Sequence, residues 1–408
     1  MQLDLPGKPH LSYCTNIHAG ETWVEIEAAL ASYLPAIKRQ VAPAVAMGIG
    51  LRLSAVAARG LAVPHVFERF KRFLDEGGFY VFTINAFPYG SFHGTRVKER
   101  VYEPDWRTLE RLRFTAEAAD VLARLLPEGG IGSVSTVPGG FRESIATPND
   151  VVSVAEGLVR AVAHLHNLRE TSGRTIVLAI EPEPACFLET TNEAVRFLED
   201  KLFSASSRAV LSGLTGMSSD RSEEALRRHL GLCFDVCHSA VAFEETAATL
   251  DDVCAAGISV AKLQFSSALS ATGRMSDLRH LFQTFDDGIY LHQAVERRNG
   301  VLTRYTDLPE AFAAAERHGK SSEWRVHCHV PVFLDRFGGL GSTQANLREA
   351  LALCRKREVA PHLEVETYTW SVLPPGIRNS DLADDIVREL QWIQSELRLS
   401  RVSNGARR

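Results

Sequence analysis

The sequence predicts a (β/α)8 TIM barrel of the α/β class, and three observations support this prediction. Eight short segments rich in Val, Ile, Leu and Phe are typical of buried strands, because apolar and polar residues do not alternate regularly in them. Amphipathic segments with helical spacing lie between most of these strands, as in parallel βαβ units. Five hydrophobic runs end in residues that bind metals or transfer protons, and a barrel gathers such residues at the carboxyl ends of its strands.

The predicted strands and helices alternate along most of the chain. The strands are expected at residues 11–17, 47–54, 79–87, 131–139, 175–183, 230–236, 260–266 and 362–368. The helices are expected at residues 21–40, 63–76, 104–126, 148–170, 191–203, 222–229, 240–256 and 343–358.

Two stretches interrupt this alternation. Residues 204–221 are rich in Ser and Gly and are predicted to form a flexible loop. Residues 267–330 are too long for one crossover, so we expect an insertion after the seventh strand that carries short extra strands and folds back over the barrel mouth. We expect one domain over residues 1–398 and a frayed polar tail over 399–408.

The composition is typical of a soluble globular protein, with 45% hydrophobic and 23% charged residues among 408. A net charge of −5 provides no basic field for a nucleic-acid backbone, so we expect no nucleic-acid partner. Seven cysteines without regular spacing indicate reduced thiols. The chain shows no secretory signal and no run of about 18 apolar residues, so we expect a cytoplasmic protein without a transmembrane segment.

The fifth and sixth predicted strands end in the most specific motifs. In TIVLAIEPEP, Glu181 and Glu183 are two residues apart, so both side chains point to the same face of a strand. The alternative is a solvated loop after the strand. In FDVCHS, Asp235 ends an apolar run and His238 follows three residues later, a pair that suits a divalent metal ion. The alternative is that Asp235 caps the next helix and His238 is merely buried; Cys233 and Cys237 are interpreted as packing residues.

Two later motifs repeat the spacing of two residues. RVHCHVP places His327 and His329 on one face of an extended segment. HLEVETYTW contains Glu364 and Glu366, and the later one is nearer the end of the strand, so we expect Glu366 to be the ligand and Glu364 to lie deeper. The predicted ligands of the divalent ion (Zn, Mn or Mg) are Glu181, Asp235, His238, His329 and Glu366.

The loops after the early strands are predicted to form the rest of the rim. Asn16 and His18 follow the first strand, Asn85 ends the third, and His93 lies on a Gly-containing loop, where loop packing is an equal alternative. Amide and aromatic groups on such loops suit a small polar ligand. In STVPGGFR, two glycines before Arg142 indicate an anion cradle. The predicted substrate-binding residues are Asn16, His18, Asn85, His93, Arg142, Glu183, Gln264 and His327.

The order of these motifs resembles that of the xylose-isomerase-like TIM barrels, which include sugar isomerases and epimerases and the zinc-dependent endonuclease IV group. The matching pieces are a Glu at strand five, FDVCHS, KLQFSS, HCHV and VET. Lys262 stands where the resemblance implies a His ligand, and His327 replaces an Asp. We therefore expect one metal ion, with Lys262 in the place of a second, contacting a substrate oxygen or a glutamate. A lysine that extends outward between two helices is the alternative.

Longer motifs resemble the EboE family of "metabolite traffic" proteins, encoded in the bacterial Ebo gene cluster. They are YCTNIHAGETW, FTINAFPYGSFHG, STVPGGFR, LAIEPEP, FDVCHSAVAFE, KLQFSSAL and VETYTW, and they cover nearly the whole chain. The resemblance implies a small-molecule metabolite, a role in moving secondary-metabolite precursors, and other Ebo-cluster proteins as partners, including a UbiA-like prenyltransferase. It implies no particular reaction.

Three functions are therefore open. The preferred one is a metal-dependent isomerase or epimerase for a small hydroxy-carbonyl compound, in which Glu181, Glu366 and Lys262 are catalytic. A nonenzymatic protein that binds a metabolite and carries it to a partner is the alternative. We expect the isomerase or epimerase chemistry together with metabolite handling as the biological role. An endonuclease IV-like phosphodiesterase is disfavoured by the acidic balance and by Lys262.

Overall fold

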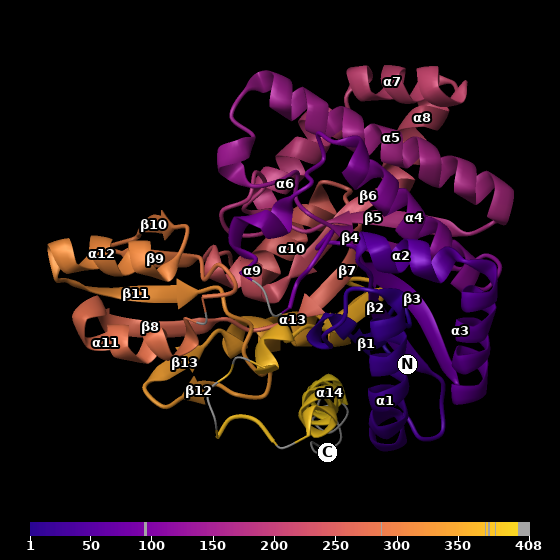
Figure 1. Cartoon of the computed structure of the whole chain (residues 1–408). Coiled ribbons are helices and arrows are strands. Elements are labelled where there is room, and N and C mark those ends of the chain that lie inside the picture. The colour runs from indigo at the N-terminus through magenta and orange to yellow at the C-terminus, as the bar shows by residue number, and fades with distance from the viewer. Residues whose placement is uncertain (94–95, 287, 372, 374–375, 380, 399–408) are drawn as a thin grey trace, which may run out of the picture.

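Eight parallel strands form a barrel in the computed structural model, which describes residues 1–93, 96–286, 288–371, 373, 376–379 and 381–398. The strand order is β1-β14-β7-β6-β5-β4-β3-β2, and every neighbouring pair in it is parallel. A parallel bridge between Cys14 and Gly50 joins the two ends of this order, so the sheet closes on itself. The predicted (β/α)8 barrel is confirmed (Figure 1).

Each of the eight predicted strands corresponds to one strand of the barrel. All eight end earlier than predicted, because the chain leaves the sheet at the rim. The bounds are β1 His10–Tyr13, β2 Met47–Arg52, β3 Phe79–Asn85, β4 Ile131–Thr136, β5 Thr175–Ile180, β6 Leu230–Asp235, β7 Val260–Phe265 and β14 His362–Val365.

Helices surround the barrel between consecutive strands. Thr22 and Glu25 form a capping box at the start of α1, and Thr147 and Asp150 form another at the start of α5, which satisfies the free N–H groups there. The helices at or near predicted positions are α1 Trp23–Val41, α3 Pro64–Gly77, α4 Leu109–Leu125, α5 Pro148–Ser172, α6 Thr191–Phe197, α8 Ser219–His229, α9 Val236–Val241, α10 Thr246–Ala255 and α13 Gln344–Lys356.

The prediction of a flexible loop over residues 204–221 is wrong. This stretch forms helix α7 (Ala205–Thr215) and the beginning of α8. Two of its serines and one of its two glycines cap helices. The Ser204 and Ser218 side chains accept hydrogen bonds from the N–H groups of Ser207 and Arg221, and Gly216 ends α7 at φ 73°. The same residue types favour loops and caps, so composition alone did not distinguish the two.

Among the described residues, two further helices around the barrel lie outside the predicted set. Helix α2 (Ala55–Ala62) precedes α3, and helix α14 (Leu382–Arg398) packs against α1 and α13. The buried face of α14 includes Ile386, Leu390 and Ile393. No helix within the described residues is both long and apolar enough to cross a membrane.

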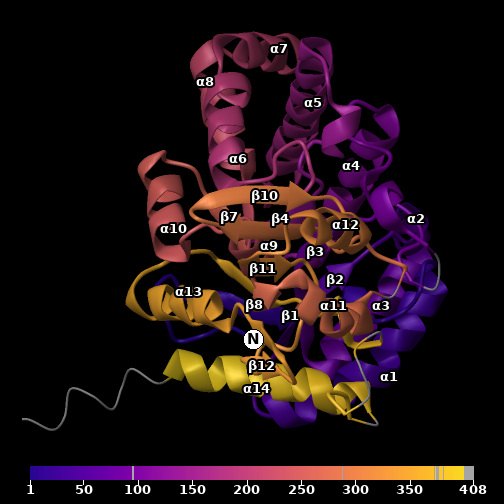
Figure 2. The ribbon, with the colours of Figure 1, turned by 90° about the vertical axis from the view of Figure 1, so that its left-hand side faces the viewer.

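The insertion after β7 forms a second, antiparallel sheet of order β10-β9-β11-β8-β13-β12. Figure 1 shows this sheet beside the barrel, and Figure 2, viewed from that side, shows it in front of the barrel strands. It extends past the predicted end at residue 330, to Ser342. Its elements are β8 Leu269–Arg274, α11 Met275–Phe282, β9 Ala294–Arg298, β10 Val301–Tyr305, α12 Leu308–His318, β11 Ser321–Val326, β12 Arg336–Phe337 and β13 Leu340–Ser342.

Candidate metal centre

Residues that follow three barrel strands and one strand of the second sheet share a cavity at the carboxyl ends of the barrel strands. β5 is followed by Glu181 and Glu183, β6 ends at Asp235, and β14 is followed by Glu366. β11 leads into the segment with the two histidines. The space in this cavity that can hold the centres of water molecules is about 60 Å³. Its acidic and imidazole lining residues are Glu181, Glu183, His238, His327, His329 and Glu366.

Three buried carboxylates converge beside the cavity. One oxygen each of Glu181, Asp235 and Glu366 lies within 4.8 Å of the other two, and these residues are 2–4% exposed. Within the described residues, Glu181 Oε2 and Asp235 Oδ2 have no hydrogen-bond partner. Carboxylates so close and so buried repel each other unless a cation or a shared proton compensates their charge.

Asp235 serves two purposes through its two oxygens. Oδ1 accepts hydrogen bonds from the His238 backbone N–H at 2.9 Å and from Ser266 Oγ at 2.8 Å, so Asp235 caps helix α9. Among the residues that the structure describes, Oδ2 has no hydrogen-bond partner and remains available as a ligand atom. The helix cap and a ligand role, which the sequence presented as alternatives, are therefore compatible.

The electrostatics of the carboxylates favour a bound cation. Burial raises the pKa of Glu181 well above its ordinary value, and the charges of Glu366 and Asp235 raise it further. Burial likewise raises the pKa of Glu366, with Asp235 adding to the shift. A divalent ion among these groups would reverse the effect, because it stabilises the ionised carboxylates.

Three histidines are oriented in the same way by carbonyl oxygens. His238 Nδ1 lies 3.0 Å from the Pro182 carbonyl, His329 Nδ1 lies 2.8 Å from the Glu366 carbonyl, and His327 Nδ1 lies 2.7 Å from the side-chain oxygen of Gln293. Each contact requires the proton on Nδ1 and leaves the Nε2 lone pair available. This is the arrangement that orients metal-binding histidines in proteins.

Burial also favours the neutral form of His238 and His327, which is the form that binds metal ions. Burial lowers the pKa of His238 to about 4, although Asp235 opposes the shift. Burial lowers the pKa of His327 well below its ordinary value, and the neighbouring His238 and His329 add to this. Neutral imidazole is the ligand form, so no proton has to be removed before a metal binds to these nitrogens.

The Glu366 carboxylate is held by side-chain amides from other strands. Oε1 accepts hydrogen bonds from Asn16 Nδ2 at 2.6 Å and from Asn85 Nδ2 at 3.4 Å, and Oε2 accepts one from Gln264 Nε2. Asn16 and Asn85 also line the cavity. Because amide N–H groups donate to it from several sides, Glu366 is fixed in one orientation.

Glu183 also lines the cavity, in a different environment from the three clustered carboxylates. Its Oε1 accepts a hydrogen bond from Tyr102 Oη at 2.7 Å and lies 3.7 Å from His327 Nδ1. Gln293 Nε2 donates to Tyr102 Oη at 2.9 Å, while its oxygen contacts His327. Burial raises the pKa of Glu183 to about 8, although the Tyr102 hydrogen bond opposes the shift.

Aromatic side chains from three loops cover the cavity. The rings of Phe92, Tyr290 and Tyr368 lie 5.2–5.3 Å apart, centroid to centroid, and Tyr290 Oη donates to the Phe92 carbonyl at 3.1 Å. Lys98 forms an ion pair of 2.5 Å with Asp307 of the insertion. The insertion thus contacts the loop after β3 directly above the clustered carboxylates and histidines.

His18 is buried and His93 is half-buried, and neither is among the residues lining this cavity in the described structure. His18 stacks on Tyr33 at a centroid distance of 4.4 Å and pairs with Tyr13 Oη at 2.8 Å. His93 packs edge-on against Phe92. Both side chains pack against neighbouring aromatic residues, which is the loop-packing alternative considered for His93.

Arg142 also lies apart from the cavity. Its guanidinium forms ion pairs with Glu189 at 3.1 Å and Glu193 at 3.0 Å, and its side chain is 45% exposed. Arg304 of the insertion pairs with the other oxygen of Glu189 at 3.1 Å. Arg142 therefore links the loop after β4 to α6 and contacts none of the clustered carboxylates.

Lys262 points inward from β7, below the cavity. Its ammonium contacts the Glu364 carboxylate and lies 3.4 Å from Ser135 Oγ, and both charged residues are fully buried. Burial alone would lower the pKa of Lys262, but the Glu364 charge raises it above its ordinary value. Neither Lys262 nor Gln264 lines the cavity in the described chain. Lys262 was expected to contact a substrate oxygen or a glutamate, and the structure shows a contact with a glutamate, Glu364.

Three further residues at the site were not predicted as functional. Tyr102 and Gln293 orient Glu183 and His327, and Cys237 adjoins the two histidines of RVHCHVP. Gln293 lies in an irregular segment and Tyr102 ends a short 3-10 helix, Lys98–Tyr102, so neither gave a periodic signal. Cys237 lies inside the FDVCHS motif, so its position one residue before His238 was the available signal.

No family model and no curated protein matches this chain. Among solved structures it is similar to the "probable 3-DHS dehydratase AsbF" of Bacillus anthracis, at 12% identity over 94% of this chain and 98% of that one, with a TM-score of 0.47. IOLI protein "with a binding zinc atom" matches at 11% identity over 95% and 97%, TM-score 0.47. A "xylose isomerase-like TIM barrel protein" of Mycobacterium smegmatis in complex with magnesium matches at 12% identity over 97% of each chain, TM-score 0.47. These values carry no information on the reaction, which must be inferred from the side chains of this chain.

Proposed function

We propose that this protein is a metal-dependent enzyme that isomerises or epimerises a small hydroxy-carbonyl compound. One observation carries the proposal: three buried carboxylates lie within 4.8 Å of one another beside a small covered cavity, and two of them, Glu181 and Asp235, each keep an oxygen without a hydrogen-bond partner in the described part of the chain. A packed core without function would not retain such a group, because each unpaired buried carboxylate oxygen lowers stability.

Glu181, Asp235, Glu366 and His238 are the residues that would hold the ion. His238 Nε2 lies 4.0 Å from Asp235 Oδ1, and the three carboxylates lie within 4.8 Å of one another. Ligand atoms on bonds of about 2.1 Å are separated by up to about 4.2 Å, so small side-chain movements complete the site. Three oxygens and one nitrogen suit Zn²⁺ or Mn²⁺ better than Mg²⁺, which prefers oxygen ligands throughout.

The remaining ligand-type histidines are adjacent. His329 lies within the same distance of Asp235 and His238 as it does of Cys237 and His327. One Nε2 lone pair binds one ion, so His329 can serve only one of the two groups.

A divalent ion at this site would polarise a carbonyl oxygen and make the adjacent C–H more acidic. Among the residues of this chain, Glu183 is then placed to move the proton, because it lines the cavity, is fixed by Tyr102, and has a pKa of about 8. A carboxyl whose pKa lies near neutral pH can both accept and return a proton. Phe92, Tyr290 and Tyr368 exclude water above it.

The experiment is a metal assay followed by a proton-exchange assay. Protein purified without chelator or affinity-tag histidines should contain a divalent metal ion, measured by inductively coupled plasma mass spectrometry. Asp235→Asn should lose at least half of it, while the matched control Asp220→Asn, at an exposed position on α8, should keep it. Sugars and sugar phosphates in D₂O should then gain deuterium next to the carbonyl. A metal-free wild-type protein, or full retention by Asp235→Asn, would contradict the proposal.

The resemblance to EboE proteins supports a biological role beside the chemistry. We propose that the protein acts in the cytoplasm on a secondary-metabolite precursor and hands it to other Ebo-cluster proteins, including a UbiA-like prenyltransferase. The small covered cavity supports a small precursor. Mass spectrometry of ligands released from protein purified from its own host should identify a small metabolite, and co-purification of a prenyltransferase would test the partner.

A further inference from the structure

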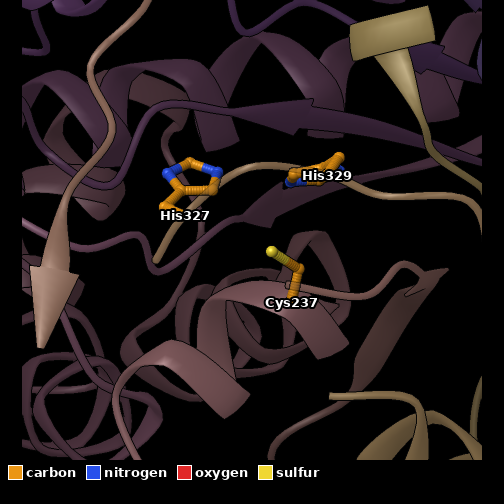
Figure 3. Close-up of side chains that lie close together, drawn as sticks. All are labelled: Cys237, His327 and His329. Carbon is orange, nitrogen blue, oxygen red and sulfur yellow. The ribbon is translucent and has the colours of Figure 1, made fainter. Parts of the chain in front are cut away.

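A second group of ligand-type side chains lies beside the carboxylate cluster. It consists of Cys237 in the first turn of α9 and the pair His327 and His329 after β11 (Figure 3). One ligand atom from each of the three lies within 4.8 Å of the others. Figure 3 shows the Cys237 thiol pointing toward the segment that carries the two imidazoles.

The two imidazole nitrogens in this group are buried and unsatisfied. His327 and His329 are 4% and 1% exposed, and their Nδ1 atoms are already paired with Gln293 and the Glu366 carbonyl. Over the described residues, neither Nε2 atom has a hydrogen-bond partner. Two buried nitrogens fixed in this way, with their lone pairs free, indicate that something binds to them.

Packing is the alternative explanation for Cys237. Its side chain does contact Val241, Ala268 and Val295 in a small apolar cluster. Packing, however, accounts only for the thiol, because it leaves the two imidazole nitrogens beside the sulfur without partners. A cation that binds one sulfur and two nitrogens accounts for all three side chains.

We propose that Cys237, His327 and His329 form a second metal site that binds a thiolate-preferring cation such as Zn²⁺ or Co²⁺. On binding, the Cys237 thiol releases its proton to solvent and the sulfur bonds to the ion. Three protein ligands leave a fourth tetrahedral position, as in sites where zinc also binds water or a substrate oxygen. His327 and His329 line the cavity, so this position faces the proposed substrate.

The two sites differ in the metal ions that they favour. The carboxylate cluster offers oxygen ligands from Glu181, Asp235 and Glu366, which suit harder cations. The second site offers sulfur and nitrogen, which suit Zn²⁺ and Co²⁺. Assigning His329 to the second site leaves His238 for the first, and neither assignment requires the other ion to be present.

Cobalt titration of the metal-free full-length protein tests this site, because a Co²⁺–thiolate bond gives a near-ultraviolet charge-transfer band. The wild-type protein should bind two equivalents and show the band. Cys237→Ala should bind one equivalent and lose the band. Cys354→Ala, which removes another buried thiol, on α13, should retain both. Asp235→Asn should retain the band with one equivalent.

The outcomes separate the two sites. A cobalt-bound wild-type protein without the charge-transfer band would overturn the second site, as would a Cys237→Ala protein that still binds two equivalents. A band that survives in wild type while only one equivalent binds would support the second site and contradict the carboxylate site. Because the band is read in the wild-type protein, a variant that misfolds does not prevent the test.

Discussion

The buried pair of Lys262 and Glu364 permits a prediction with a defined magnitude. Lys262→Met keeps an unbranched side chain that is one atom shorter, and it removes the charge that faces the Glu364 carboxylate in the barrel interior. Removing one partner of a buried ion pair costs about 3–5 kcal/mol. Glu364 can reduce this loss of stability by taking up a proton, so the largest possible loss depends on the pH.

This limit follows from the ordinary pKa of Glu, 4.5. Burial already raises the pKa of Glu364 in the wild-type protein, while Lys262 opposes the shift. In Lys262→Met this opposition is lost and the folded-state pKa rises further, so more stability is lost as the pH rises above 4.5. Holding the proton at pH 7 costs at most about 3.4 kcal/mol, since 2.5 pH units correspond to about 1.36 kcal/mol each. At pH 5 the same cost is about 0.7 kcal/mol.

Urea unfolding followed by circular dichroism at pH 5 and pH 7 measures the difference. Lys262→Met should be several kcal/mol less stable than wild type at pH 7 and much closer to it at pH 5. The double variant Lys262→Met, Glu364→Gln should recover most of the loss at pH 7, because it leaves no buried charge. Metal content should stay the same in both. An equal loss at both pH values would show that packing is responsible, and no loss would refute a buried ion pair.

Three further predictions concern the interior and the site. Gly50→Ala should lower the free energy of unfolding by about 1–3 kcal/mol, seen as a lower melting temperature, because its Cβ would lie 1.7 Å from Glu364 Oε1. Glu389→Leu should cost about 3 kcal/mol and weaken metal binding in calorimetry, because this carboxylate accepts hydrogen bonds from the loops on both sides of the site. Glu183 has a pKa of about 8, so folded protein holds a proton that the unfolded chain releases above about 4.5, and stability falls as the pH rises to 8. Glu183→Gln should flatten this fall in urea midpoints; an unchanged slope would contradict the raised pKa.

The sequence predicted the barrel well because buried parallel strands have a composition of their own and recur between amphipathic helices. It also indicated which strand ends carry acids and histidines. The orientation of side chains at the rim was harder to infer. Arg142 and His18 follow strands as expected, but both side chains contact local partners and do not line the cavity. A guanidinium or imidazole on a rim loop can reach several partners, and the local sequence does not predict which of them it contacts.

Long-range pairing accounts for the other omissions. Cys237 was interpreted as a packing residue because its histidine neighbours lie 90 or more positions away, after β11. Gln293 contacts His327 from an irregular segment, where no periodicity marks it. The prediction of a loop over residues 204–221 was wrong because Ser and Gly favour helix caps as well as loops.

The second sheet supplies more than a cover, since the chain that continues from its strand β11 contains two of the clustered histidines. The residue that orients one of them, Gln293, precedes its strand β9. Any affinity measured for a metal ion bound through these histidines will therefore include the free energy of ordering the insertion. A protease cut within residues 267–342 should weaken that affinity without changing a single ligand. Loss of the insertion during evolution would then remove the metal centre as well.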